Sequence, residues 1–421
     1  MAIFMVYYGK SSKVYVRKDL IYMKHLVILV DGAADYPHEK LGGKTPLEVA
    51  NKPYMDKLAQ MGECKLLETV PSHMSPGSDV ANLAIMGYDP DKYYSGRSPL
   101  EGVSMGVEIL DTDTTFRANT VTLSDDTEYE NKTMVDYSAG EITTAESTEL
   151  IKYLDEKLGN DLYRLFPGVS YRHLLLWHDS LDEIKFTPPH DISGKKVTEY
   201  LPGDARFLEI MKKSYELLKD HPINKNRISR GLNPANSVWF WGQGTKPLLP
   251  NFFEKYGKKG SMISAVDLLK GIGLCAGMRS IDVEGTTGTI ETNFDGKTEA
   301  AINEFKNGQD FVYIHLEAPD ECGHHFDAEG KVKSLELIDE KVVKPLYEYL
   351  ESCGEDYAVL ITPDHATPLA KGTHTHDKIP YIIYRSNAPI DGVPCYCEKC
   401  ATGDAGFAGY KIMDYFIKGE I

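Results

Sequence analysis

The sequence predicts an α/β fold, with a mostly parallel sheet flanked by helices. Three runs of apolar, β-branched-rich residues are typical of buried parallel strands, and they lie at 25–30, 311–316 and 357–361. Between the last two runs, residues 328–350 repeat apolar side chains at the spacing of one helix face. Strand and helix therefore alternate at both ends of the chain, which is the pattern of a parallel sheet.

The first of these ends contains a strand, a helix and a further short strand before its most unusual loop. The strand 25–30 stops abruptly at Asp31-Gly32. Thr45 before Pro46 looks like a helix cap followed by proline at the first helical position. Apolar residues then keep helical spacing as far as Met61, so we expect one helix there and a short strand over 65–70.

The middle third of the chain has a different texture. It mixes strands at 116–123, 171–177 and 237–241, a helix at 144–158, and loops at 188–191 and 224–236. We therefore expect a discontinuous core made of residues 23–112 and 259–421. Residues 113–258 would form an inserted α+β domain, and residues 1–22 a leader to which we assign no role.

Composition narrows the classes of partner. The 46 Lys and Arg against 63 Asp and Glu give a net charge of −17, and no basic stripe is present, so nucleic acid is not an expected partner. A small anionic phosphorylated substrate is still compatible, because a bound metal reverses the local field. No apolar run approaches the roughly 20 residues that span a bilayer. The first 22 residues lack the features of a signal peptide.

The cysteines favour a reducing compartment, and we expect a cytoplasmic protein. Seven are present without an evident disulfide framework. Cys395, Cys397 and Cys400 form a tempting metal cluster, but no fourth ligand is evident and the spacing fits no zinc pattern well. We therefore expect a surface loop there. The sequence gives no indication of the oligomeric state.

The segment around Ser78 is the clearest candidate for a reactive loop. A Pro76-Gly77 turn runs into an apolar-periodic stretch that stops at Gly87, which predicts that Ser78 lies in the first turn of a short helix. The free N–H groups of such a turn attract anions, so a phosphate would fit beside the Ser78 hydroxyl. The alternative is that Ser78 is only a helix cap.

Acidic residues follow each of the three buried strands. Asp31, Asp320 and Asp364 should gather at one edge of the sheet, since ligands bind outside the carboxyl ends of parallel strands. Histidines accompany them at His324, His365, His374 and His376. Carboxylate and imidazole donors suit Mn²⁺ or Zn²⁺ in an open catalytic site. Two such ions about 4 Å apart would clamp a phosphoryl group and activate a hydroxyl such as that of Ser78.

Taken together, these segments resemble a known family. The chain is similar to the archaeal-type branch of the cofactor-independent phosphoglycerate mutases, in the alkaline phosphatase superfamily. The resemblance covers the chain from about Met23 to near its end. It is carried by Val30-Asp31-Gly32, Gly77-Ser78-Asp79-Val80, Ser95-Gly96-Arg97-Ser98, Phe116-Arg117-Ala118-Asn119, Asp320-Glu321-Cys322-Gly323-His324 and Thr362-Pro363-Asp364-His365.

The resemblance implies an alkaline-phosphatase-like core with an inserted substrate domain, two divalent metal ions and no bisphosphoglycerate. Mn²⁺ is the expected metal, with Zn²⁺ or Mg²⁺ as alternatives. One ion would be held by Asp31, Ser78, Asp364 and His365. The other would be held by Asp320, His324 and His374, with His376 as the alternative to His374. Ser78 would carry the phosphoryl group during interconversion of 3-phosphoglycerate and 2-phosphoglycerate, a step of glycolysis and gluconeogenesis.

The insert supplies the candidate substrate-binding cations and also the point where the resemblance weakens. Arg97, Arg117, Arg172 and Arg230 are candidates for gripping carboxylate and phosphate groups. The family's Arg-Ala-Gly-Arg stretch is replaced here by 138–141, Ser-Ala-Gly-Glu. Other stretches resemble a bacterial subgroup proposed to phosphorylate homoserine. A homoserine kinase-type phosphotransferase, a metal-dependent phosphatase and a catalytically silent metal-binding homologue are the alternatives.

Overall fold

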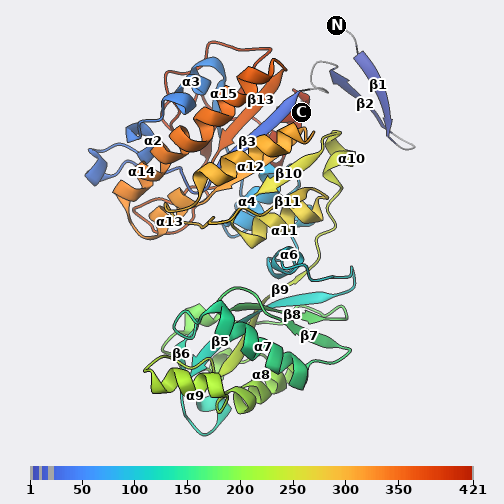
Figure 1. The fold of residues 1–421 in the computed structure, drawn as a ribbon, viewed down its shortest axis with the longest axis vertical. Coiled ribbons are helices and arrows are strands. Elements are labelled where there is room, and N and C mark those ends of the chain that lie inside the picture. The colour runs from blue at the N-terminus through green and yellow to red at the C-terminus, as the bar shows by residue number, and fades with distance from the viewer. Residues whose placement is uncertain (1–2, 9–11, 18–22, 420–421) are drawn as a thin grey trace. The chain divides into compact units, whose positions relative to one another are not determined.

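A mostly parallel central sheet is formed by the two ends of the chain, residues before 95 and after 248. The computed structural model describes residues 3–8, 12–17 and 23–419, and within them this sheet has seven strands (Figure 1). Its first five strands run parallel, β14 is antiparallel to both neighbours, and the α/β prediction is confirmed. The strand order is β11 (Arg279–Ile281), β10 (Gly260–Ile263), β12 (Phe311–Leu316), β3 (Lys24–Val30), β13 (Tyr357–Thr362), β14 (Ile379–Arg385) and β4 (Glu63–Leu67).

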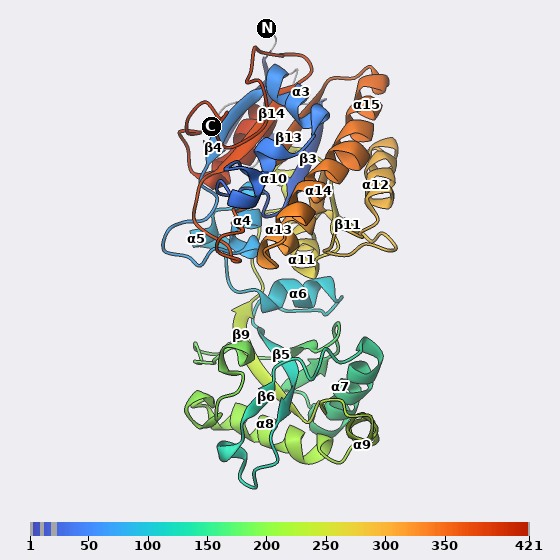
Figure 2. The same ribbon diagram turned by 90° about the vertical axis from the view of Figure 1, so that its left-hand side faces the viewer.

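Helices cover both faces of this sheet, which is why its central strands are apolar throughout. Alternate residues of β3, such as Leu26 and Ile28, join a core with one set of helices (Figure 2). That set is α2 (Pro46–Val49), α3 (Pro53–Met61), α12 (Phe294–Lys306), α14 (Ala328–Ile338) and α15 (Lys344–Cys353). On the other face, the ring of His25 meets Phe416 of α16 (Ile412–Lys418). Also in this part of the chain are α4 (Ser78–Ile85), α5 (Pro90–Tyr93), α10 (Phe252–Tyr256), α11 (Asp267–Cys275) and α13 (Ala318–His324).

Two predicted helices differ in detail. The helix expected from Thr45 to Met61 is broken into α2 and α3, because Pro53 has no N–H to continue the ladder and itself starts α3. Thr45 caps α2 as expected, within a capping box completed by Glu48. The helix expected over 328–350 contains a π-helical segment, Asp339–Val343, between α14 and α15. Asp339 accepts N–H bonds from Tyr54 and Met55 and so satisfies the start of α3.

The middle of the chain forms a second unit around an antiparallel sheet. In that unit β5 (Thr114–Leu123) pairs with β6 (Met134–Asp136), β8 (Arg172–Trp177) and β9 (Ser237–Thr245), and β8 also pairs with β7 (Tyr163–Phe166). Its helices are α6 (Ser98–Ser104), α7 (Thr144–Leu158), α8 (Ala205–Leu218) and α9 (Pro222–Ser229). The loop predicted over 224–236 is wrong in its first part, since Pro222 opens α9 and His221 caps it.

The division between the two units falls at different residues from those expected. The first unit comprises Met1–Tyr94 and Leu249–Ile421, and the second comprises Ser95–Leu248. Residues 95–112 belong to the second unit because Val107 and Ile109 pack with Leu174 and Leu176 of β8. Residues 249–258 belong to the first unit, where the ring centroids of Phe252 and Phe311 lie 4.6 Å apart.

The leader contains two short strands. In the leader, β1 (Ile3–Tyr8) and β2 (Ser12–Arg17) pair antiparallel. Within the described residues, no helix has the length and apolar character needed to cross a membrane.

The C-terminal cysteines lie in a loop, as expected, but the expectation that this loop lies at the surface is wrong for its middle. Tyr396 and Cys397 are fully buried in the main core. The Tyr396 hydroxyl donates to the Pro380 carbonyl at 2.8 Å, and its backbone N–H donates to Asp56 at 2.9 Å.

Stability of the second unit should depend on pH through His173. Burial lowers the pKa of this imidazole to about 3. Its Nδ1 accepts the Gly168 N–H at 3.1 Å, and Nε2 lies 3.4 Å from the Thr120 hydroxyl. Between about pH 6.5 and pH 3, the imidazole of His173 is therefore protonated in the unfolded chain and neutral in the folded chain. The stabilisation is complete above that pH and falls by about 1.4 kcal/mol per unit as pH drops toward 3.

The measurement is urea unfolding at several pH values between 7 and 4, on the wild type and on His173→Asn, whose amide oxygen keeps the Gly168 bond. The variant should lose less stability per pH unit than the wild type. Equal slopes would remove His173 as the source.

Candidate metal centre and active site

Three carboxylates meet at one edge of the central sheet. Strands β12, β3 and β13 are parallel neighbours, so their carboxyl ends share that edge. Asp31 follows β3, Asp364 follows β13, and Asp320 lies in α13 just after β12. All three are buried. Backbone approach is close here, since the Gly32 N–H donates to Asp364 at 3.2 Å.

Gly32 is required by this approach. Its φ is +61°, and a Cβ on it would lie 2.5 Å from an Asp320 oxygen. Any side chain at this position would therefore strain the backbone and displace Asp320. The glycine after Asp31 is thus required because the backbone of residue 32 lies against both Asp320 and Asp364.

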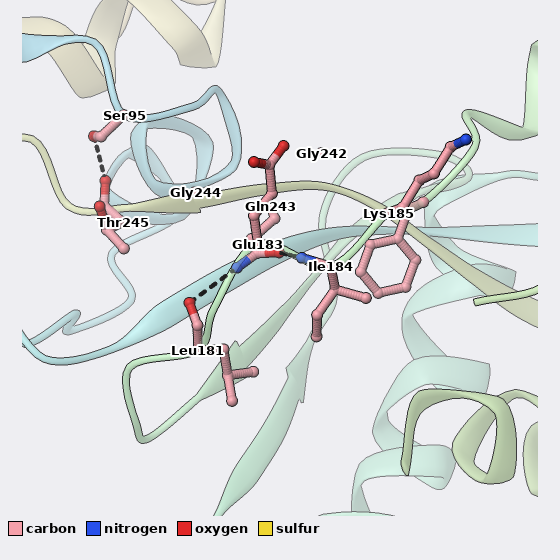
Figure 3. A pocket seen from close by; sticks show the side chains of 10 residues that line it. Ser95, Leu181, Glu183, Ile184, Lys185, Gly242, Gln243, Gly244 and Thr245 are labelled. Carbon is pink, nitrogen blue, oxygen red and sulfur yellow. Dashed lines mark hydrogen bonds between the residues drawn. The ribbon is translucent and has the colours of Figure 1, made fainter. Parts of the chain in front are cut away.

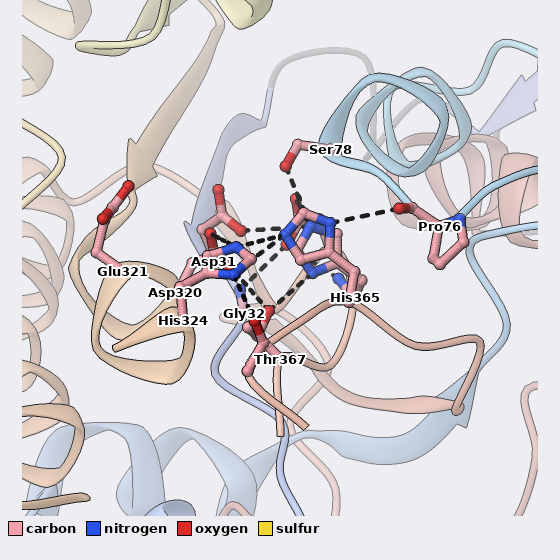
Figure 4. A network of polar contacts seen from close by, with 12 residues as sticks. Asp31, Gly32, Pro76, Ser78, Asp320, Glu321, His324, His365 and Thr367 are labelled. Carbon is pink, nitrogen blue, oxygen red and sulfur yellow. Dashed lines mark hydrogen bonds and ion pairs between the residues drawn. The ribbon is translucent and has the colours of Figure 1, made fainter. Parts of the chain in front are cut away.

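His365 lies at the centre of a first group of candidate ligands (Figure 4). Its Nε2 lies 3.1 Å from the Ser78 hydroxyl oxygen, 3.3 Å from Asp364 and 3.7 Å from Asp31. Ligand atoms of Asp31, Asp364 and His365 all fall within 4.8 Å of one another. The structure thus brings together the four residues predicted for one ion.

A second group adjoins the first. Nε2 of His324 lies 3.2 Å from one oxygen of Asp320, and Nε2 of His374 lies 3.4 Å from the other. The His374 ring stacks on His365 with centroids 3.8 Å apart. His376, the alternative to His374, is exposed and its Nε2 meets the Met74 carbonyl at 2.7 Å. Of the two histidines, His374 is therefore the one that lies beside Asp320 and His365.

The burial and mutual proximity of the carboxylates in this cluster favour the binding of a cation. Burial raises the pKa of Asp31 well above its ordinary value, and the nearby Asp364 and Asp320 charges raise it further. In the part of the chain that the structure describes, Oδ1 of Asp31 is buried without a hydrogen-bond partner. A buried, unpaired carboxylate oxygen beside two further carboxylates is strongly unfavourable unless a cation binds.

The histidines point to the same conclusion. Nδ1 of His324 meets the Gly372 carbonyl at 2.9 Å, and Nδ1 of His374 meets the Pro76 carbonyl at 3.3 Å. A proton on each Nδ1 leaves the two Nε2 lone pairs facing each other across 2.9 Å. Backbone carbonyls commonly orient metal-binding imidazoles in this way. The donor set of carboxylates, imidazoles and a hydroxyl therefore fits a divalent metal centre.

Helix α4 positions Ser78. Gly77 is the cap and Ser78 is the first helical residue, so the alternative that Ser78 is only a cap is wrong. One turn later, the Asn82 amide donates to the Ser78 carbonyl at 2.8 Å and to Asp364 at 3.0 Å. Its oxygen accepts the Tyr313 hydroxyl at 2.6 Å. Asn82 therefore fixes the start of the helix against the carboxylate cluster.

The expected anion pocket at the start of α4 is partly filled by the chain itself. Asp79 accepts the Val80 N–H at 2.9 Å, and its other oxygen accepts the Tyr94 hydroxyl at 2.7 Å. The Val80 N–H is thus not open to a phosphate. The negative charge of Asp79 also opposes an anion at this helix end.

Several supporting residues were missed in the sequence. His315, inside the buried strand β12, places its Nε2 2.7 Å from Asp31 and its Nδ1 3.1 Å from the Ser264 hydroxyl. Lys331 is buried and donates to Asp35 at 2.7 Å and to the Thr367 carbonyl at 2.8 Å. Thr367 in turn donates to Asp320. The one available signal was a titratable residue within an apolar strand, as at His315.

In the second unit, three of the four predicted arginines surround one carboxylate. Nε of Arg97 and Nε of Arg117 contact the two oxygens of Glu101 at 2.9 and 3.0 Å. The Arg117, Arg97 and Arg172 charges lower the pKa of Glu101 against the effect of its burial. Arg117 also stacks over Trp241 at 4.1 Å. Arg230 is not with them, because it lies beside Asn226 and Glu146.

The Ser138–Glu141 stretch is a tight turn. Ala139 and Glu141 both have positive φ, 49° and 51°. Asp136 holds the turn by accepting the N–H groups of Ser138 and Gly140 at 2.8 and 2.7 Å. Arg227, a buried residue, donates to the Ala139 carbonyl at 2.6 Å. This turn adds the negative charge of Glu141 where the family pattern has arginine.

A cavity of about 770 Å³ also opens in the second unit (Figure 3). Gln243 spans part of its wall, accepting the Ile184 N–H at 2.8 Å and donating to the Leu181 carbonyl at 3.3 Å. None of the predicted site residues lines it. We assign it no role in the chemistry.

Comparisons with known proteins agree with the geometry. A family model described as 2,3-bisphosphoglycerate-independent phosphoglycerate mutase matches residues 59–224. A mutase of that name from Methanothrix thermoacetophila is 49% identical over 383 residues, covering 90% of this chain and 95% of the relative.

Solved structures extend the likeness to the fold. A Pyrococcus horikoshii protein superposes with a TM-score of 0.78 at 29% identity, covering 95% of this chain and 99% of that one. The cofactor-independent phosphoglycerate mutase of Thermoplasma acidophilum gives 0.65 at 26% identity, covering 94% and 99%. With its strand-end carboxylates, its serine and this identity over nearly its whole length, the chain belongs to the family of 2,3-bisphosphoglycerate-independent phosphoglycerate mutases.

Proposed function

We propose that the protein interconverts 3-phosphoglycerate and 2-phosphoglycerate through a phosphoserine at Ser78. The observation that carries the proposal is the position of the Ser78 hydroxyl, 3.1 Å from His365 within a buried cluster of carboxylates and imidazoles. Relatives nearly half identical to this chain are named as such mutases. The seven free cysteines fit a reducing compartment, so we place the enzyme in the cytoplasm.

Family membership implies dependence on divalent metal ions, and the donor set fits them. We propose two ions, with Mn²⁺ preferred for these hard oxygen and imidazole donors. Asp31, Ser78, Asp364 and His365 would hold one, and Asp320, His324 and His374 the other. When bound, the ions would lower the pKa of the serine hydroxyl and neutralise charge on the phosphoryl group.

The chain's own residues set the geometry of transfer. The Ser78 oxygen forms a bond to phosphorus as the bond from phosphorus to the substrate's 3-oxygen breaks. The serine proton is lost, and the departing alkoxide gains one. The 2-oxygen of the glycerate then forms a bond to phosphorus as the bond from phosphorus to the Ser78 oxygen breaks. The 2-hydroxyl loses its proton, and the serine oxygen regains one, which restores Ser78. Asn82 keeps the serine in place through both steps, because it bonds the Ser78 carbonyl and Asp364.

The second unit would bind the rest of the substrate. Arg97, Arg117 and Arg172 form a cationic group around Glu101, suited to a carboxylate or phosphate. Glu101 fixes the guanidinium planes by accepting from Nε of two of them. We leave Arg230 out of this role, because it lies beside Asn226 and Glu146 rather than beside Glu101. The Ser95–Leu248 unit would thus be the substrate domain.

Purified protein with Mn²⁺ should convert 3-phosphoglycerate to 2-phosphoglycerate without added bisphosphoglycerate. A coupled assay for 2-phosphoglycerate measures this. Release of free phosphate without isomerised product would identify a phosphatase. Turnover only with ATP and homoserine would identify the kinase-type alternative, and either result would overturn the proposal.

Ser78→Ala should abolish mutase activity, with a loss of at least about a thousandfold in kcat, because no hydroxyl remains to accept the phosphoryl group. Asn82→Ala, which keeps the hydroxyl but removes its anchoring bonds, should retain measurable turnover. Mass spectrometry of the wild type after mixing with substrate should detect phosphate on the peptide that contains Ser78. Full activity of Ser78→Ala would exclude a phosphoserine route.

Chelation should remove activity, and Mn²⁺ should restore it. His374→Ala should weaken metal affinity by tenfold or more, since an imidazole ligand is lost. His376→Ala is the matched control from the same loop and should bind metal as the wild type does. Isothermal titration of the chelated protein measures both affinities, and an equal loss in the two variants would contradict the assignment of His374.

Arg117→Lys should raise KM for 3-phosphoglycerate about 10- to 100-fold, because a charge-assisted bond and a planar guanidinium are lost. Arg230→Lys should change KM by less than about twofold. Steady-state kinetics on both variants provides the comparison. A larger effect at Arg230 would show that the substrate lies elsewhere in the unit.

A further inference from the structure

Three cysteines near the C-terminus place their sulfurs together. The Sγ atoms of Cys395, Cys397 and Cys400 all lie within 4.8 Å of one another. Cys395 is 3.8 Å from Cys397 and 3.0 Å from Cys400, sulfur to sulfur. The Cys400 N–H donates to the Cys397 carbonyl at 3.2 Å, so the two residues between them form a tight turn. This turn directs both thiols to one side.

A fourth cysteine approaches this group from a distant part of the sequence, although its sulfur is not one of those that lie within 4.8 Å of one another. Cys64 lies in the edge strand β4 and is 2% exposed. The chain just after Cys400 is attached to it, because the Thr402 N–H and hydroxyl both donate to the Cys64 carbonyl at 3.0 Å. Burial raises the pKa of the Cys64 thiol to about 12, and the neighbouring Cys400 and Cys395 thiols add to the rise. Cys64 also shares the main core with Cys397.

The buried ammonium group of Lys52 lies near two of these thiols. The Lys52 ammonium is 2% exposed and pairs with Asp56 at 2.7 Å, and Asp56 accepts the Tyr396 N–H at 2.9 Å. The Lys52 charge acts on both Cys64 and Cys395, opposing the burial that raises their pKa values. Thiolates formed at this place would therefore be partly neutralised.

We propose that Cys64, Cys395, Cys397 and Cys400 bind one structural zinc ion. Zinc bound to sulfur at about 2.3 Å in a tetrahedron separates the sulfurs by roughly 3.8 Å. Cys395 and Cys397 already stand at that distance, whereas Cys395 and Cys400, 3.0 Å apart, would move apart on binding and the Cys64 side chain would turn toward the other three. Four sulfur donors select zinc, whereas the oxygen and imidazole donors of the active centre do not require it. On binding, each thiol releases its proton to solvent. Such a site would be closed, since the four cysteines would fill all four positions.

The zinc loop would also support the active centre. Glu398, within the loop, accepts the Asp35 N–H at 3.0 Å and the Thr45 hydroxyl at 2.7 Å. Asp35 lies four residues after Asp31 and bonds Lys331 and the Leu369 N–H. A metal that fixes the loop would thereby fix the chain that leaves β3 through Asp31. Loss of the ion should lower both stability and mutase turnover.

A disulfide between Cys395 and Cys400 is the competing use of these thiols. Their 3.0 Å separation exceeds the roughly 2.05 Å of a sulfur–sulfur bond. A Cys395–Cys400 disulfide would leave Cys397 and Cys64 as free thiols. Thiol counting distinguishes the two, because denatured, chelated protein would offer seven reactive thiols if all cysteines are reduced. A disulfide would reduce that count by two.

The decisive experiment uses the wild type, purified under mild reducing conditions and loaded with Co²⁺ in place of its metals. Thiolate ligation gives sulfur-to-cobalt charge-transfer bands in the near ultraviolet, which the carboxylate and imidazole ligands of the active centre do not produce. We expect these bands, with seven titratable thiols after unfolding. Their absence, or a count of five, would overturn the proposal.

Variants then assign the ligands. Cys64→Ser and Cys397→Ser should each weaken the bands and lower the melting temperature, while Cys353→Ser, in α15 and outside the cluster, should change neither. Zinc content after mild chelation should fall from one retained ion per chain in the wild type and Cys353→Ser to none in the cluster variants. Unchanged bands in Cys64→Ser would overturn the four-cysteine site, whether or not activity survives.

Discussion

The crowding of three buried carboxylates at the end of three neighbouring strands is the constraint on which the rest of the structure depends. Asp31, Asp320 and Asp364 repel one another, and burial removes the water that would otherwise screen them. The fold tolerates this arrangement because other groups bind its periphery. His315 reaches Asp31 from inside the sheet, Asn82 reaches Asp364 from α4, and Thr367 reaches Asp320. The interior of the cluster is left for cations.

Much of this arrangement follows from the sequence, because it depends on strand ends. An apolar run with an aspartate shortly after its end indicates both a buried strand and the edge of the sheet at which a ligand binds. The aspartate follows β3 directly, β13 after Pro363, and β12 after the residues 317–319. The choice between His374 and His376 could not follow, since both lie in one irregular loop whose path is set by contacts with Pro76 and Met74. The approach of Cys64 to Cys395 and Cys400 could not be predicted for a similar reason, because those two residues lie more than 300 positions further along the chain.

The second unit shows where local patterns fail. Its strands were recognisable, but α9 was hidden in a polar stretch whose helix is stabilised by tertiary bonds. The Asn224 amide donates to the Leu218 and Ala235 carbonyls, both at 2.8 Å. The arginines had no periodicity to group them, and Glu101 supplies the grouping only once α6 and β5 are packed together. Charges that act through a shared counter-ion are invisible to spacing rules.

Gly32 has a consequence that reaches beyond its own turn. Because Asp320 occupies the space that a Cβ on residue 32 would need, Asp320 packs directly against the main chain that leaves β3. The position of Asp320 relative to Asp31 therefore depends on main-chain packing at residue 32, and not on side-chain rotamers alone. A catalyst that must accept a phosphoryl group and return it to another oxygen benefits from such a rigid spacing. A redesign that replaces metal-ligating residues of this centre should therefore keep Gly32.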